Sequence, residues 1–142
     1  MISEDRQWFK CKGASAEALA ELRQVIDADL PEKYYELMAY TNGGEGALPV
    51  FPFLFCLYSV EKAKSSARGR AWSDFPDFFI IGDNGGNELI GFDLQAERRW
   101  RIVTIDSMNI DLDACVGNVA PDFDTFLQMI GIKSDCFNTT SE

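Results

Sequence analysis

The segment from Phe78 to Ile105 constrains the fold most, because it contains three strand-like runs in close succession. Phe78–Ile81 is a short continuous apolar run, as expected for a central strand, and Glu88–Leu94 alternates between apolar and polar residues. Trp100–Ile105 is rich in β-branched residues. The intervening Gly82–Asn87 consists largely of Gly, Asn and Asp, which accept positive φ. The segment therefore predicts strands joined by a hairpin turn.

Four other segments have the features of helices. Ser15 caps the first and Pro31 lies in the first turn of the second, where its missing N–H has no partner to lose. The predicted helices occupy residues 15–26, 30–41, 59–67 and 121–130. Their buried positions are expected to be Leu19, Leu22 and Ile26, then Tyr34, Leu37, Met38 and Thr41, and finally Phe123, Phe126, Leu127 and Ile130. Asn42–Gly44 and Gly131 are suited to end helices.

The remaining segments predict less regular structure. Pro49 and Pro52 favour an irregular or edge strand before Phe53–Leu57. The glycine-rich segments 42–46 and 82–86 are interpreted as structural turns, and residues 106–118 as a long polar passage. Residues 68–77 are expected to form a loop anchored by Trp72. The length predicts a single domain over 1–142, with its core at about 15–131 and a flexible tail at 134–142.

Charge is distributed unevenly along the chain. The chain has 23 acidic and 13 basic residues, a net charge of −10. Residues 1–73 hold ten acids and nine bases, whereas residues 74–142 hold thirteen and four. An acidic half of this kind repels nucleic acid and anionic membranes, and attracts a basic partner. The alternative is that the acidic surface serves solubility alone.

The four cysteines, Cys11, Cys56, Cys115 and Cys136, are widely spaced and form no CxxC pair. The N-terminal residues do not resemble a signal peptide, and no apolar run approaches the roughly 20 residues of a membrane helix. We therefore expect reduced, structural thiols and a cytoplasmic location.

Catalytic motifs are few. The chain has no histidine, which removes the commonest general base and zinc ligand. A pair of carboxylates remains the one serious enzymatic alternative, but Asp106, Asp111 and Asp113 lie in a polar segment without apolar neighbours to raise a pKa. The glycine-rich segments lack the lysine and helix of a phosphate loop, and the six-residue turn is too short for a calcium loop. We expect no catalytic residue, cofactor or metal.

Four sequence blocks, in order, resemble the SUKH superfamily, the domains related to the fungal Smi/Knr cell-wall regulator. The blocks are Leu30–Met38 with Asn42–Gly46, Ser59–Glu61, Ile80–Asp93 and Phe123–Leu127. Together they span most of the chain, from about 15 to 130. Asp122 departs from the pattern, since a small residue such as Ser often precedes the first Phe of the closing helix. The segment with Pro49 and Pro52 is a second departure.

The resemblance implies an α+β fold, with helices packed around a mostly antiparallel sheet. Bacterial members look like immunity proteins that bind and neutralise a toxin domain, often a nuclease or deaminase. Fungal members look like regulatory scaffolds, so a non-catalytic scaffold of the same fold is the alternative function. The family is not known for a catalytic site. The sequence leaves the oligomeric state and the identity of the toxin open.

Charge and predicted loop placement, independently of the resemblance, select the acids expected to contact a basic protein partner. They are Asp83, Glu88, Asp106, Asp111, Asp113, Asp122 and Asp124. For Asp122 and Asp124 there is an alternative explanation, since acids are also favoured at the start of a helix.

Overall fold

The computed structural model describes residues 1–26, 29–68, 77–95, 100–108 and 116–134. Within them, seven strands form one sheet in the order of the sequence, and every neighbouring pair is antiparallel. The strands are β1 (Trp8–Lys10), β2 (Gly44–Ala47), β3 (Leu54–Leu57), β4 (Phe78–Asp83), β5 (Glu88–Asp93), β6 (Ile102–Asp106) and β7 (Val116–Ala120). The helices are α1 (Ala16–Val25), α2 (Glu32–Tyr40), α3 (Val60–Arg68) and α6 (Phe123–Met129). The α+β fold with an antiparallel sheet is thus confirmed.

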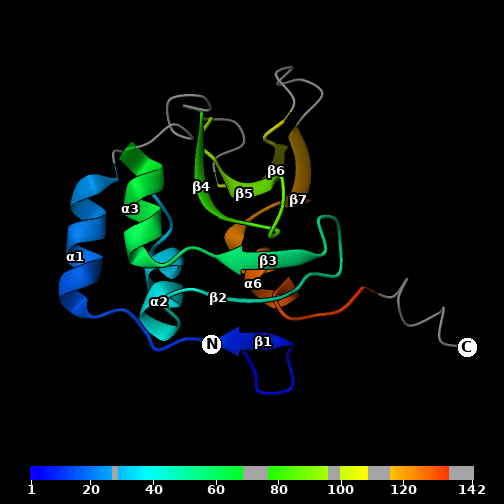
Figure 1. The fold of residues 1–142 in the computed structure, drawn as a ribbon, viewed down its shortest axis with the longest axis horizontal. Helices are drawn as coiled ribbons and strands as arrows, with labels where there is room; N and C mark the ends of the chain where they lie inside the picture. Colours follow the sequence, from blue (N-terminus) through cyan, green and yellow to red (C-terminus); the bar gives the residue numbers. More distant parts are fainter. Residues whose placement is uncertain (27–28, 69–76, 96–99, 109–115, 135–142) are drawn as a thin grey trace, which may run out of the picture.

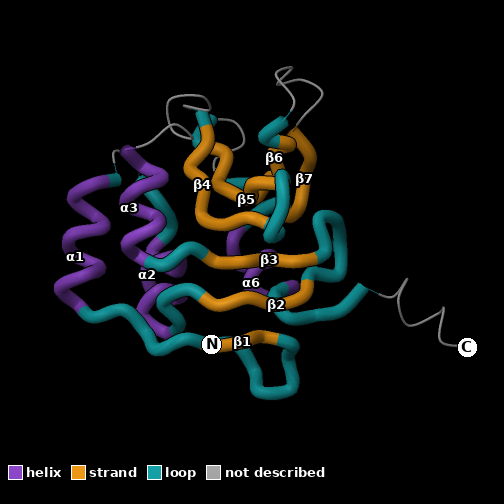
Figure 2. Tube along the Cα trace, in the orientation of Figure 1, coloured by secondary structure: helices purple, strands orange, loops and turns teal. Residues whose placement is uncertain are grey.

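The sheet and helices are arranged in two parts that Figures 1 and 2 show from the same side. Helices α1, α2 and α3 gather on one side of the molecule, and the strands fill the other. Helix α3 packs between α1 and β4, while α6 lies behind the sheet and contacts β7 and α2. Strands β1 to β3 run across the lower part of the view, below β4 to β7.

An aromatic cluster forms the centre of the core. Tyr34 of α2 is fully buried, and its ring meets those of Phe79, Phe92 and Phe123 edge-on. Phe126 of α6 lies against Phe55 of β3, with 5.0 Å between ring centroids. Helices α2 and α6 therefore attach to the inner face of the sheet through the buried positions that their periodicity predicts.

Helix boundaries follow the capping signals of the sequence. The Ser15 hydroxyl accepts a 3.1 Å hydrogen bond from the Ala18 amide, so it caps α1 as predicted. Gly131 follows α6 at a φ of 86°, a conformation that glycine adopts without strain. Strand β4 lies in the middle of the sheet, as the apolar run Phe78–Ile81 predicts.

Three strands were missed by the sequence analysis. The segment 42–46, interpreted as a turn, contains β2, and the passage 106–118, interpreted as polar loop, contains the start of β7. No strand was predicted at β1. Strand β2 needs its glycine: a Cβ at Gly46 would lie 2.2 Å from the Gln7 carbonyl oxygen and 2.7 Å from the Trp8 ring. Close approach of β1 therefore dictates a residue type that is rare in strands.

Some predictions fall outside the described residues: those for Trp72, Asp111, Asp113, Cys115 and Cys136, and for residues 135–142 of the predicted tail. Cys11 and Cys56 are free thiols. None of the described helices has the length and apolar character needed to cross a membrane.

Candidate functional site: an acidic edge and an apolar groove

The antiparallel register brings three of the predicted acids together. Strand β4 ends at Asp83, β5 begins at Glu88 and β6 ends at Asp106. Glu88 pairs directly with Asp106, and the Ser107 amide donates a 2.9 Å hydrogen bond to the Asn87 carbonyl. We call Asp83, Glu88 and Asp106 the acidic edge, because they lie where the β4–β5 turn meets the end of β6.

Hydrogen bonds hold the carboxylates of the acidic edge. Asp83 accepts from the Tyr58 hydroxyl at 3.0 Å and from the Gly85 amide at 2.9 Å. Asp106 accepts from the Met108 amide at 3.0 Å. Within the described part of the chain, no lysine or arginine forms an ion pair with any of the three acids. The three carboxylates therefore have no ion-pair partner among these residues, although Lys62 lies over the ring of Tyr58, which donates to Asp83.

The crowding of charge raises the pKa of neighbouring groups. Burial raises the pKa of Glu88, and the charge of Asp106 raises it further, although the Thr104 hydroxyl, which donates at 3.2 Å, opposes the shift. Burial and the charge of Asp83 likewise raise the pKa of Tyr58. Both shifts have the direction expected where negative charge accumulates in a partly buried place.

Asp122 and Asp124 have a different setting, at the start of α6. The Asp122 carboxylate accepts from the Thr125 amide at 2.7 Å and caps the helix, and this bond lowers its pKa. Asp124 forms a 2.9 Å ion pair with Lys33 of α2. The structure thus gives both acids a local role at the helix start, which is the alternative that the sequence left open for them.

A fully buried acid lies elsewhere in the sheet. Asp93 is inaccessible to solvent and pairs with the Arg101 guanidinium at 2.8 Å, while the Gln95 amide donates to its other oxygen at 3.0 Å. A buried carboxylate needs such partners to remain charged. Asp93 therefore contrasts with the acidic edge, and it has a structural explanation. Within the described ranges, no group of three or more Cys, Asp or Glu side chains is placed to hold a metal ion.

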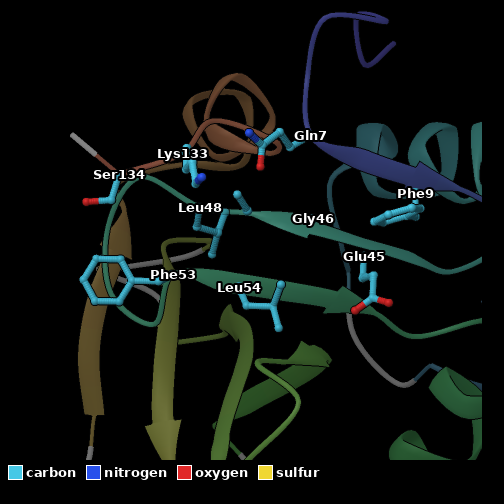
Figure 3. A pocket seen from close by; sticks show the side chains of 10 residues that line it. Gln7, Phe9, Glu45, Gly46, Leu48, Phe53, Leu54, Lys133 and Ser134 are labelled. Atoms are coloured by element: carbon cyan, nitrogen blue, oxygen red, sulfur yellow. The ribbon is translucent and has the colours of Figure 1, made fainter. Parts of the chain in front are cut away.

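An apolar groove on the outer face of β1 to β3 was not anticipated from the sequence. It has a volume of about 390 Å³, and its lining includes Phe9, Glu45, Leu48, Phe53, Leu54 and Lys133. Figure 3 shows Phe9 and Glu45 at one end and Phe53 and Ser134 at the other. The sequence signal for it is slight, since Phe9 belongs to strand β1, which was not predicted, and Pro49 and Pro52 indicated only an irregular or edge strand.

The groove and the acidic edge adjoin each other. Gly85 in the β4–β5 turn lies over β3, where a Cβ would be 3.7 Å from Leu54 Cδ2 and 4.0 Å from Cys56 Sγ. Strand register also places Cys56 between Glu45 on β2 and Asp83 on β4. Leu54 and Cys56 therefore link the groove to the acidic edge.

Comparison with known proteins identifies the family. The model of the SMI1 / KNR4 family (SUKH-1) matches residues 13–129, which include β2 to β7 and all four described helices. A search of curated proteins finds no match to this chain. Since the family match covers most of the sequence and the antiparallel α+β fold agrees with the resemblance, the chain belongs to the SMI1 / KNR4 family (SUKH-1).

Proposed function

We propose that the chain is a bacterial immunity protein that binds a basic toxin domain in the cytoplasm and neutralises it by covering its active surface. The observation that carries the proposal is the acidic edge: three carboxylates at neighbouring strand ends, none of them ion-paired with a lysine or arginine among the described residues. The sequence also predicts that Asp111 and Asp113 contact the partner, and both lie outside the described residues. Family membership supports a protein partner.

Electrostatics explains why such a partner would be basic. Like charges held together cost free energy in the unbound protein, and a cationic surface relieves that cost on binding. Toxins that act on nucleic acid, such as nucleases and deaminases, present basic active sites because their substrate is a polyanion. An acidic protein can therefore compete for the surface that the nucleic acid would occupy. No catalytic role is proposed for these carboxylates.

The direct test is co-expression with candidate basic toxin domains, beginning with any that is encoded beside this gene. We expect growth to be restored and a stable complex to co-purify. Neutralising the edge with Glu88→Gln and Asp106→Asn should weaken rescue, whereas Glu17→Gln and Glu36→Gln, which neutralise exposed acids on α1 and α2, should not. The matched pair separates the position of the charge from the net charge, since both double variants lose the same two charges.

Failure of rescue together with absence of a complex would contradict immunity and favour the regulatory scaffold. In that case, partners other than toxins would have to be sought by pull-down. If the purified chain has hydrolytic activity and Glu88→Gln abolishes it, the carboxylate-based hydrolase is favoured instead. Glu88 and Asp106 would then be the carboxylate pair, because they face each other on the neighbouring strands β5 and β6.

A further inference from the structure

The outer face of β1 to β3 exposes aromatic side chains that the inner face would bury. Phe55 on the inner face is fully buried against α6, whereas Phe9 on the outer face is 78% exposed. Phe51 and Phe53 in the β2–β3 connection are 52% and 40% exposed. Burying a side chain of this size is favourable, because it removes apolar surface from water. A ligand that covers the groove therefore buries apolar surface that stays exposed in the isolated chain, and this burial favours binding.

The connection that carries Phe53 has an unusual backbone. Phe53 adopts a φ of 70°, a region that bulky residues rarely occupy. Two hydrogen bonds hold it there: the Leu48 amide donates to the Phe53 carbonyl at 3.0 Å, and the Phe53 amide donates to the Val50 carbonyl at 2.8 Å. Positive φ at a non-glycine residue is typical of functional sites, where it positions a side chain at some cost. Here it places Phe53 at one end of the groove.

Negative charge is concentrated at the other end of the groove. Glu45 lines it beside Phe9, and the Cys56 thiol donates to the Glu45 carboxylate at 3.7 Å. Burial, followed by the charges of Asp83 and Glu45, raises the pKa of Cys56 to about 11. Cys56 thus lies between Glu45 and Asp83, and both carboxylates are near the same end of the groove. Lys133 also lines the groove, away from Glu45. The groove therefore carries a negative charge near Phe9 and a positive charge farther along it.

These observations identify the kind of occupant. We propose that the groove receives an apolar side chain of a basic protein partner, whose neighbouring Lys or Arg residues lie against Glu45 and the acidic edge. The inference rests on the proposed function for the class of partner, and it specifies the anchor of that complex. A second copy of the chain suits the groove less well, because two copies would each bring a net charge of −10.

The groove is only partly built from the region that the family model matches. Glu45, Leu48 and Leu54 lie within residues 13–129, whereas Phe9 and Lys133 lie outside it. The exposed ring at one end and the cation therefore come from segments beyond the matched core.

A short peptide tests the groove without a toxin. The probe is Arg-Lys-Phe-Lys-Arg, and the amide resonances of the full chain are followed by NMR as the peptide is added to millimolar concentration. We expect saturable shifts at Phe9, Glu45 and Leu54, weaker shifts when Ser replaces the central Phe, and none when Glu replaces the basic residues. Absence of saturable shifts, or equal shifts with all three peptides, would overturn the proposal.

Substitutions at Phe9 then test the groove in the complex itself. Phe9→Thr keeps a residue suited to a strand, and we expect it to weaken toxin affinity at least about tenfold, as for a central aromatic anchor. Gln24→Thr on α1 is the control, because Gln24 is exposed and does not line the groove, and its affinity should stay unchanged. Unfolding of both variants is measured in parallel to show that the fold is retained.

The outcomes separate this inference from the proposed function. If the wild type binds and rescues while Phe9→Thr does so equally well, the groove proposal fails and immunity stands. If no toxin is bound, immunity fails and the peptide result decides whether the groove takes a basic, apolar ligand. A dimer that Phe9→Thr dissociates would assign the groove to a second copy. Saturable peptide binding that appears only after removal of residues 135–142 would assign the groove to the chain's own terminus.

Discussion

Acids at the start of α6 and acids at the acidic edge are alike in sequence but differ in what surrounds them. Asp122 accepts an amide hydrogen of the helix, and Asp124 is paired with Lys33. At the edge, Glu88 faces Asp106 instead of a cation. A carboxylate that caps a helix or pairs with a cation stabilises the fold, whereas like charges held close together oppose it, even where each accepts an amide hydrogen, as Asp83 and Asp106 do. The stability of the fold therefore accounts for the acids at the start of α6, but not for the acidic edge.

This difference gives a physical criterion for ranking candidate binding residues. Acids with a structural explanation need no partner, and their removal should act on stability. Acids held beside other acids, as Glu88 is opposite Asp106, cost stability in the free protein, and residues that bind or catalyse are often kept at such a cost. The criterion favours the acidic edge over the α6 acids as a docking surface, and substitutions in each region should produce opposite patterns of effect.

The largest effect is expected on stability, when the buried Phe126 ring of α6 is removed. Phe126→Ala should lower the free energy of unfolding by about 3–5 kcal/mol, because a fully buried ring that contacts Phe55 leaves a cavity. Urea unfolding measures the loss. Phe9→Ala is the control, since its ring is mostly exposed, and should change stability within about 0.5 kcal/mol. A loss below about 1 kcal/mol for Phe126→Ala would contradict the burial of this face of α6.

Reversing one charge should have the next largest effect, and on binding instead of stability. Asp106→Lys is expected to slow association with the basic toxin domain on the order of tenfold at low salt, because steering depends on the local field. The dependence of the rate on ionic strength should also become weaker. Glu36→Lys on α2 makes the same charge change away from the acidic edge. Equal rates and equal salt slopes for the two variants would contradict the edge as the docking surface.

The sequence predicted the parts of the fold that local signals determine. Helix α1 begins where Ser15 caps it, and the buried stripe of α2 follows a period of 3.6 residues. Such signals need only neighbouring residues. Strands β2 and β7 have no comparable signal, because glycine and asparagine interrupt them and they exist through pairing with distant segments. In β2, the demand for Gly46 comes from the approach of β1.

The candidate site was predictable to a similar extent. Charge alone selected the acids, and the antiparallel register brought Asp83, Glu88 and Asp106 together because they end or begin consecutive strands. Sequence could not separate them from Asp122 and Asp124, since the distinction depends on whether another acid, a cation or a helix start lies beside each carboxylate. The groove was missed because it lies between β1, the β2–β3 connection and the segment after α6, which are far apart in the sequence.

A pH series on Asp122 sharpens the stability side of the comparison. Its folded pKa is lowered, so the stabilisation by its charge is present above the unfolded pKa and is lost as pH falls through the folded pKa. Asp122→Asn keeps a capping oxygen but removes the charge. We expect a lower urea midpoint than wild type at pH 7, a difference that disappears at strongly acidic pH, and unchanged toxin affinity. A constant difference at all pH values would contradict the role of the charge.

The smallest change in stability is expected for Glu88→Gln, and it is opposite in sign to that of Asp122→Asn. Its folded pKa is raised, so ionisation of Glu88 disfavours the fold at neutral pH, and this cost disappears as pH falls below the unfolded pKa. Glu88→Gln retains an oxygen for the Thr104 hydroxyl while removing the charge beside Asp106. The urea midpoint should therefore rise slightly at pH 7 and match wild type at acidic pH, while toxin binding weakens. A lower midpoint at pH 7 would show that the Glu88 charge serves the fold, and the distinction between the two groups of acids would then fail.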